Sequence, residues 1–208
     1  MTVTEALLAF SVAAGLLTLT PGLDTALVLR TAASEGPRPA VLAAVGICVG
    51  TLGWGAAVGF GLGALLAASH LAYDVLKWIG AGYLVWLGVG MILKPRSAFQ
   101  VANGDAAPRG GASWLWKGML NNLLNPKAGV FYVSFLPQFI PAGVPVAPFA
   151  ILLAALHCCM GLAYFAMLIA ATRPIANALQ KAAVVRWLDR LTGGVFVGFG
   201  VRLALERR

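Results

Sequence analysis

Two long stretches of the chain, residues 41–73 and 140–172, contain no Asp, Glu, Lys or Arg. A helix of a soluble protein keeps one face in water, so it cannot be apolar on all sides over such a length. A membrane core about 30 Å thick is crossed by roughly 20 apolar residues in helical conformation. Only 11% of the residues are charged, whereas soluble domains carry about 25%. The chain is therefore predicted to be an integral membrane protein.

Apolar segments separated by polar or Pro/Gly-rich breaks predict an all-α fold with six transmembrane helices. Their approximate bounds are 6–31, 40–69, 74–93, 114–140, 144–172 and 187–205. In the sixth span only eleven residues separate Arg190 from Arg202, so these side chains must reach toward the membrane surfaces. Six spans use nearly the whole chain and leave no room for a soluble catalytic or nucleotide-binding domain.

The net charge of +8 comes from Lys and Arg residues that lie between the apolar segments and form no single basic face. This distribution favours anchoring in the lipid bilayer and argues against nucleic acid as a partner. With six spans, ten basic residues fall in the first, third and fifth loops, and four fall on the other side. Because cytoplasmic loops are enriched in Lys and Arg, the odd-numbered loops are predicted to be cytoplasmic and both termini to lie outside.

The residue types needed for enzymatic or metal chemistry do not form a recognisable pattern. The sequence has no evident catalytic triad, no cluster of metal-ligating side chains and no phosphate-binding glycine loop. Cys48, Cys158 and Cys159 lie within apolar segments without a Cys-x-x-Cys motif, so they are interpreted as small buried side chains. We therefore expect neither an enzyme nor a protein that holds a metal or cofactor.

Three short motifs recur in the same order in both halves of the chain, at offsets of 105, 109 and 110 residues. Thr20-Pro21-Gly22 corresponds to Asn125-Pro126-Lys127, Lys77-Trp78 to Arg186-Trp187, and Gly88-Val89-Gly90 to Gly198-Phe199-Gly200. Each half holds three spans, so the second half must enter the membrane inverted. We predict one transmembrane transporter domain over 1–208, with halves at about 6–93 and 114–205 joined by a flexible loop at 94–113. Inverted repeats with broken helices are typical of transporters.

The two proline motifs are expected to break the first and fourth helices. Thr20 and Asn125 can act as N-caps, and Pro21 and Pro126 can each begin a restarted helix, where the missing N–H costs nothing. A restarted helix presents N–H groups and a positive dipole end that suit an anionic group. The alternative is a simple proline kink whose backbone groups bond to neighbouring helices.

Asp24 and Lys127 are the clearest charges inside the predicted spans. Intramembrane charges usually pair with one another or line a substrate or proton path, and these two could pair across the halves. Asp24 is interpreted as a group that titrates during transport or holds a substrate ammonium. The alternative for Asp24 is a position near the cytoplasmic membrane surface.

Four further polar residues lie in the predicted spans. Asn121, Asn122 and Asn125 precede the second break, and Asn121 and Asn125 share a helical face. These amides could bind substrate or form hydrogen bonds between helices. His157 in the fifth span is a candidate for proton transfer, and the alternative is a histidine with a purely structural hydrogen bond.

The chain resembles the lysine exporter family of bacterial amino-acid efflux proteins, which includes the homoserine and threonine exporters. The resemblance is carried by LTPGLD at 19–24 and NLLNPKA at 122–128, with support from GAGYL at 80–84, FLPQF at 135–139 and GFGVR at 198–202. The family's first motif usually has a second proline where this chain has Leu23. The resemblance implies six spans, gradient-driven export from the cytoplasm, location in the bacterial cytoplasmic membrane and assembly into homo-oligomers.

The sequence thus predicts a secondary active exporter that moves amino acids or their derivatives out of the cytoplasm and is coupled to the proton gradient. The predicted substrate and proton pathway comprises Thr20, Pro21, Gly22, Asp24, Asn121, Asn122, Asn125, Pro126, Lys127 and His157. One alternative is export of another small solute or of a metal cation, although cation sites usually have several carboxylates or thiolates. Another is a membrane thiol-disulfide electron carrier, since Cys48 and Cys158 occupy corresponding spans at an offset of 110.

Overall fold

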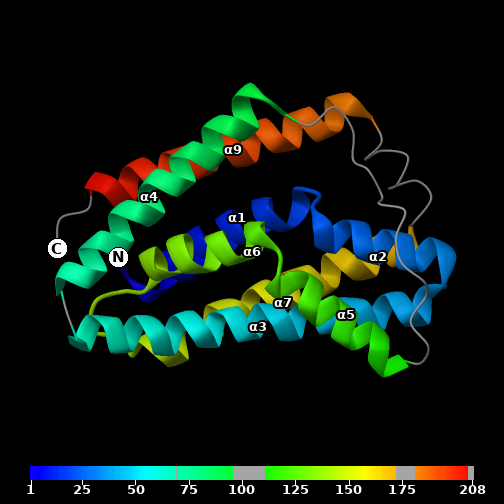
Figure 1. The fold of residues 1–208 in the computed structure, drawn as a ribbon, viewed down its shortest axis with the longest axis horizontal. Coiled ribbons are helices and arrows are strands. Elements are labelled where there is room, and N and C mark those ends of the chain that lie inside the picture. Colours follow the sequence, from blue (N-terminus) through cyan, green and yellow to red (C-terminus); the bar gives the residue numbers. More distant parts are fainter. Residues whose placement is uncertain (69, 96–110, 172–180, 206–208) are drawn as a thin grey trace.

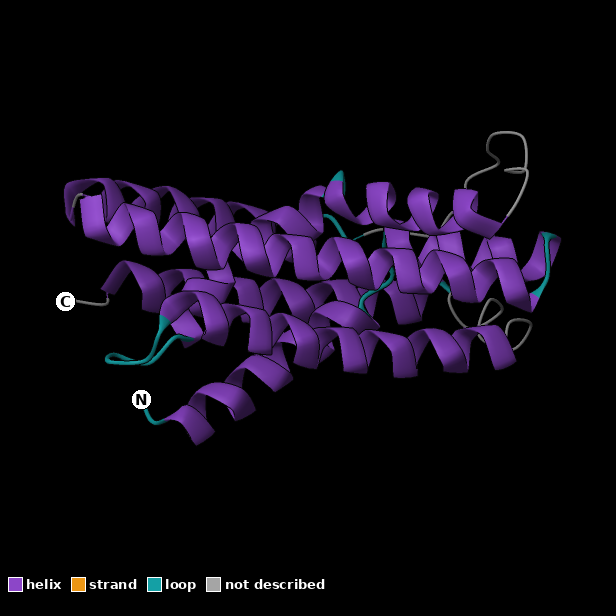
Figure 2. Cartoon of the chain, turned by 90° about the horizontal axis from the view of Figure 1, so that it is seen from below, coloured by secondary structure: helices purple, strands orange, loops and turns teal. Residues whose placement is uncertain are grey.

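The computed structural model describes residues 1–68, 70–95, 111–171 and 181–205, and these residues form helices and turns without any strand (Figures 1 and 2). The helical segments are α1 (Val3–Leu19), α2 (Leu23–Ser34), α3 (Pro37–Ala68), α4 (His70–Leu93), α5 (Gly111–Leu123), α6 (Pro126–Val130), the π-helix η1 (Phe131–Phe135), the 3-10 helix η2 (Leu136–Phe139), α7 (Val146–Ala170) and α9 (Ala182–Leu205).

The prediction of an all-helical membrane protein is confirmed at this level. Among the described residues, α3 over Pro37–Gly61 and α7 are long and apolar enough to cross a membrane. Helices α1 and α2 would form a third span, bent by 52° at the break between them. The count of six spans stays a prediction. Most of the predicted loop at 94–113 lies outside the described residues, as do Ser69 and Thr172.

The helices lie in three layers (Figure 1). Helices α4 and α9 pack along each other and form one outer layer. The other outer layer contains α3, which packs against both α5 and α7. Between them lie α1, α6 and η1, so that the segment before the first break and the segment after the second break occupy the middle of the molecule (Figure 1).

Glycines allow the outer-layer helices to approach closely. A Cβ atom on Gly88 of α4 would lie 2.5 Å from the carbonyl oxygen of Gly193, and one on Gly193 would lie 2.6 Å from that of Gly88. Between α3 and α5, a Cβ atom on Gly46 or Gly118 would overlap a backbone carbonyl of the facing helix. Small residues at helix contacts are the usual means of close packing in membranes.

Aromatic side chains fill the core beside α1. Phe10 of α1 packs against Phe131 and Phe139, with ring centroids 5.9 and 5.5 Å apart. Phe135 packs against Phe196 of α9 at 5.5 Å, and all five rings are at most 2% exposed. This cluster joins the π-helical and 3-10 segments to both α1 and α9.

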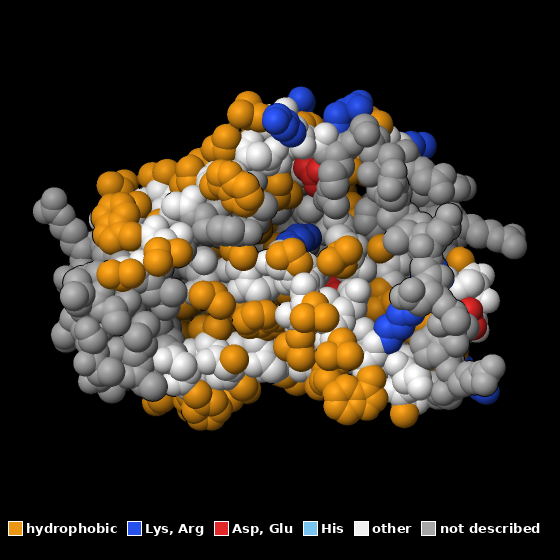
Figure 3. Space-filling view, viewed as in Figure 1, with side chains coloured by type: hydrophobic (Ala, Val, Ile, Leu, Met, Phe, Trp, Pro, Cys, Tyr) orange, Lys and Arg blue, Asp and Glu red, His pale blue; other side chains and the backbone are white. Residues whose placement is uncertain are grey.

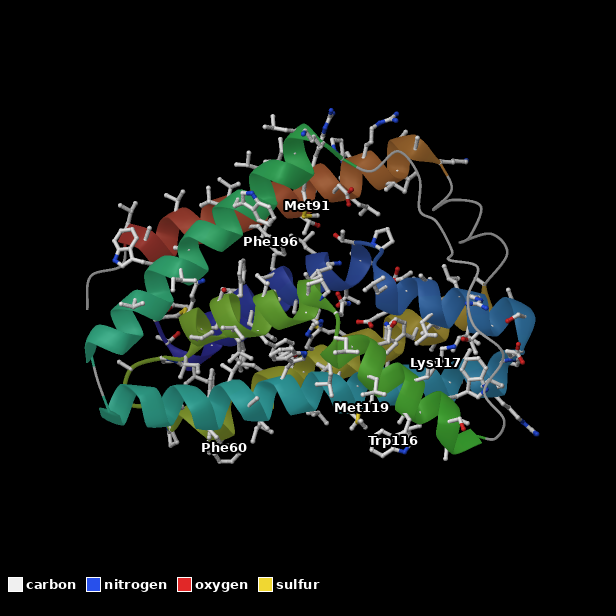
Figure 4. The ribbon with its side chains drawn as sticks, viewed as in Figure 1. Phe60, Met91, Trp116, Lys117, Met119 and Phe196 are labelled. Atoms are coloured by element: carbon white, nitrogen blue, oxygen red, sulfur yellow. The ribbon has the colours of Figure 1, made fainter. Side chains whose placement is uncertain are left out.

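Large apolar side chains also cover the outward faces of the helices. Phe60 of α3 and Trp116 of α5 point away from the bundle, whereas Met91 and Phe196 lie between the α4–α9 pair and the middle layer (Figure 4). On the face shown in Figure 3, apolar side chains extend over most of the described surface. An apolar exterior of this kind suits contact with lipid tails.

The contact between α4 and α9 provides a test of the packing. We expect Gly88→Val to lower the stability of the purified protein by about 1–3 kcal/mol, because the new side chain would collide with the Gly193 backbone. Gly90→Val is the matched control, since a Cβ atom there meets nothing within 4 Å. Thermal unfolding in detergent compares the variants, and equal midpoints for the two would contradict this packing.

Candidate functional site

The first half of the chain breaks between α1 and α2. Thr20 ends α1, because its backbone N–H and its hydroxyl both donate to the carbonyl oxygen of Leu16, at 3.0 and 2.8 Å. Helix α2 begins at Leu23, with Gly22 as its N-cap residue and no capping side chain. The prediction that Thr20 caps α2 and Pro21 begins it is therefore wrong. The threonine hydroxyl bonds backward to α1 instead of forward to α2.

The second half breaks between α5 and α6. Helix α5 ends at Leu123, and Pro126 is the first residue of α6. The side-chain oxygen of Asn125 accepts a hydrogen bond of 3.1 Å from the backbone N–H of Lys127, so Asn125 is the N-cap. The two breaks therefore differ in detail: a side chain caps the helix that follows the second break, and none caps the helix that follows the first.

Asp24, in the first turn of α2, accepts hydrogen bonds from three amide side chains of the second half. Asn121 donates to Oδ1 at 2.7 Å, and Asn122 and Asn125 donate to Oδ2 at 2.9 and 3.2 Å. Both carboxylate oxygens act as acceptors, which is the role of an ionised carboxylate. The asparagine cluster predicted from its spacing thus surrounds the acidic residue of the opposite half.

Lys127, in the first turn of α6, makes the reverse connection. Its ammonium donates to the carbonyl oxygens of Leu17 and Thr20, at 2.8 and 2.6 Å. These carbonyls belong to the last turn of α1, where carbonyl groups lack helical partners and the dipole is negative. Each half therefore satisfies polar groups that the break exposes in the other half. Asp24 and Lys127 thus each have hydrogen-bond partners in the opposite half.

A cavity of about 70 Å³ lies between the two breaks. It is lined by seven of the ten predicted pathway residues, namely Thr20, Gly22, Asp24, Asn122, Asn125, Lys127 and His157. Asn121 reaches the site through its hydrogen bond to Asp24. Pro21 and Pro126 belong to the breaks themselves, and neither lines the cavity.

His157 of α7 is held by side chains from two other elements. Its Nε2 atom lies 3.1 Å from the hydroxyl of Thr18, and its Nδ1 atom lies 3.0 Å from that of Tyr132. The ring also contacts Phe10 and Phe131 edge to face. The histidine therefore lies in a hydrogen-bonded chain from α1 to η1 beside the cavity. This geometry is compatible with either of its two interpretations.

Several polar residues of the site were not predicted from the sequence. Thr18, Thr51 and Tyr132 also line the cavity, and the hydroxyls of Thr20 and Thr192 form a buried hydrogen bond that links α1 to α9. Single hydroxyl residues in apolar segments carry no distinctive spacing. For Thr192 the sequence offers one signal, because Asp189 lies three residues before it on the same helical face. In the structure both side chains are buried.

Cys48 and Cys158 form a symmetric contact between α3 and α7. The Cys48 thiol donates to the carbonyl oxygen of Cys158 at 3.8 Å, and the Cys158 thiol donates to that of Cys48 at 3.3 Å. Both thiols are free and buried, and both line the cavity, whereas Cys159 is exposed. The two residues at corresponding sequence positions thus meet in the structure.

Comparison with known proteins finds relatives that match almost the whole chain. The sequence model for LysE type translocators matches residues 16–207. The chain is 32% identical to a leucine efflux protein of Klebsiella pneumoniae, over 95% of this chain and 93% of the relative. It is 30% identical to a homoserine/homoserine lactone efflux protein of Salmonella typhimurium, over 96% of each chain. An uncharacterized membrane protein of Vibrio cholerae is 32% identical over 96% of this chain and 97% of its own. No solved structure matches the chain.

The two roles of Asn125 can be separated by substitution. Serine is a good N-cap but has no amide to donate to Asp24, and alanine supplies neither function. We expect stability to fall in the order wild type, Asn125→Ser, Asn125→Ala, with the loss of the cap worth about 1 kcal/mol. Thermal unfolding of the purified proteins measures this order. Equal midpoints for the serine and alanine variants would show that the cap contributes nothing.

Proposed function

The chain belongs to the LysE type translocator family, and from this premise we propose that it is a secondary active exporter of amino acids or their derivatives. The observation that carries the proposal is the cavity between two helix breaks, where each half supplies one charge. Helix ends and ionisable side chains in the membrane interior are features of substrate and ion sites in transporters. The efflux functions named for two relatives point to the same class of solute.

The proposed architecture is six membrane spans in two inverted halves. Three observations support it. Helices that are third in each half, α4 and α9, pack together, and so do the second helices, α3 and α7. The beginning of α1 and the end of α9 lie at the same end of the molecule (Figure 1), as an even number of crossings requires. The reciprocal contact of Cys48 and Cys158 lies where a two-fold axis between the halves would pass.

The proposed orientation puts the odd-numbered loops in the cytoplasm and the termini outside. On the face shown in Figure 3, most described Lys and Arg side chains lie in the half of the molecule that contains α2 and α5. This half is opposite to the end at which α1 begins (Figure 1). A concentration of basic residues favours the cytoplasmic side, here of the bacterial cytoplasmic membrane.

The proposed mechanism is alternating access by rocking of one half against the other. A zwitterionic substrate enters the cavity with its carboxylate toward Lys127 and the uncapped start of α2, and its ammonium toward Asp24. These contacts replace the hydrogen bonds that the two charges make across the halves. Coupling to the proton gradient through Asp24 and the His157 chain, and assembly into homo-oligomers, belong to the same proposal.

The thiol-disulfide electron carrier remains a second candidate because Cys48 and Cys158 meet beside the cavity. In favour of transport, the thiols donate to backbone carbonyls, as buried structural cysteines do. Among the described residues no group of three or more His, Cys, Asp or Glu side chains could hold a metal ion, so nothing in that part of the chain favours a metal cation as the cargo.

Export from intact cells tests the proposed function. Cells that express the chain are preloaded with dipeptides to raise internal amino acids, and the medium is followed by mass spectrometry. We expect one or a few amino acids to appear faster than from empty-vector cells, and a protonophore to abolish the difference. Asp24→Asn should lower the initial rate at least about tenfold, because it removes the charged partner of three hydrogen bonds. Rates equal to the empty vector, with the protein present in the membrane, would refute the proposal.

The cysteines distinguish the two candidate functions. We expect a variant with Cys48→Ser, Cys158→Ser and Cys159→Ser to export at a rate within about threefold of wild type, because Ser preserves a donor to each carbonyl. Cys159→Ser alone is the control for substitution outside the pair. Complete loss of activity in the triple variant, with normal folding, would favour the electron carrier.

A further inference from the structure

The charges that line the cavity balance each other. Among the residues that the structure describes, the lining contains one carboxylate, that of Asp24, and one ammonium, that of Lys127, beside the imidazole of His157, which lies between the hydroxyls of Thr18 and Tyr132. Asp24 is held by neutral amides, and Lys127 donates to neutral backbone carbonyls. Asp189 is a further buried acid, but it belongs to α9 and does not contribute to the lining. The cavity therefore presents one charge of each sign.

A charge that enters such a cavity without a partner is strongly disfavoured. In the interior of a membrane protein, charges are far more costly than in water unless they are paired. An amino acid with an uncharged side chain brings one positive and one negative group and leaves the balance at zero. A basic amino acid would leave one extra positive charge, and an acidic one an extra negative charge.

The remaining wall of the cavity contains, among the described residues, no further Asp, Glu, Lys or Arg that could balance a charged side chain, and its polar groups include the uncharged hydroxyls of Thr18, Thr25 and Tyr132. It includes the apolar side chains of Ile47 and Phe165, which are 3% and 6% exposed, and the hydroxyl of Thr51. The Thr51 hydroxyl donates to Asn122 Oδ1 at 3.4 Å, so it belongs to the network around Asp24. A carboxylate at this position would be suitably placed to balance a basic side chain.

Resting on the proposed export function, we propose that this cavity selects amino acids with uncharged side chains and excludes basic and acidic ones, and that the neutrality of Thr51 is part of this selection. The apolar surface of Ile47 and Phe165 receives the substrate's side chain. Selectivity thus follows from charge balance and does not require a dedicated contact for each side chain.

Counterflow with the purified protein in proteoliposomes tests this selectivity. Separate batches are loaded with unlabelled leucine, homoserine, lysine, arginine or glutamate, and uptake of the same radiolabelled amino acid is measured. We expect exchange of leucine or homoserine to exceed that of lysine, arginine and glutamate at least about 100-fold. Comparable exchange of neutral and basic amino acids would overturn the charge-balance inference and leave the export function standing. No exchange of any amino acid by folded, reconstituted protein would overturn both.

A gain of function tests the role of Thr51. We expect Thr51→Asp to exchange lysine at least about tenfold faster than Thr51→Asn, because only aspartate adds the charge that balances a basic side chain. Thr51→Asn is the matched control of similar shape. Equal lysine exchange by the two variants, both monodisperse in detergent, would overturn the role of Thr51. The wild-type selectivity above tests the inference independently of whether either variant folds.

Discussion

The arrangement of this molecule depends on an exchange of polar contacts between two broken helices. A helix that stops inside a membrane leaves carbonyl and N–H groups that lipid cannot satisfy. Here Lys127 of the second half bonds to the last carbonyls of α1, and the three asparagines of the second half bond to Asp24 of the first. At each break, therefore, polar groups form hydrogen bonds with the other half. The same contacts hold the halves together and keep two opposite charges beside one cavity, so stability and the proposed transport function rest on the same residues.

Much of the fold could be predicted from the sequence because the bilayer imposes a simple rule on it. Uncharged stretches such as 41–73 and 140–172 favour helices that cross the membrane, and α3 over Pro37–Gly61 and α7, which lie largely within them, are long and apolar enough to do so. Asn125 and Pro126 also behave as their local chemistry suggested, because an N-cap and a first-turn proline depend on a few adjacent residues. Thr20 did not, since a threonine hydroxyl can cap the next helix or bond back to the preceding turn. Its surroundings, which include Thr192 and Lys127, are formed by distant parts of the chain.

The rest of the site could not be predicted because it depends on which helices pack together. The hydrogen bonds from Thr18 and Tyr132 to His157, and the reciprocal contact of Cys48 with Cys158, join positions that nothing in local spacing connects. Cys48 and Cys158 are 110 residues apart, the same offset as between the two Gly-x-Gly motifs. This offset suggested corresponding positions in the two halves, but it did not predict a contact. The glycines of α3 are a partial exception, because close helix packing is the usual reason for their presence. Only the structure shows which helix each one faces.

In the proposed mechanism, an exported amino acid binds between Asp24 and Lys127 and takes over part of their contacts across the halves. The most direct test is an experimental structure of the protein with such an amino acid bound. We expect the ammonium within hydrogen-bond distance of Asp24, the carboxylate within that distance of Lys127 or the start of α2, and fewer contacts across the halves than before binding. An amino acid bound elsewhere, with the three asparagine bonds to Asp24 and both carbonyl bonds of Lys127 unchanged, would contradict this mechanism.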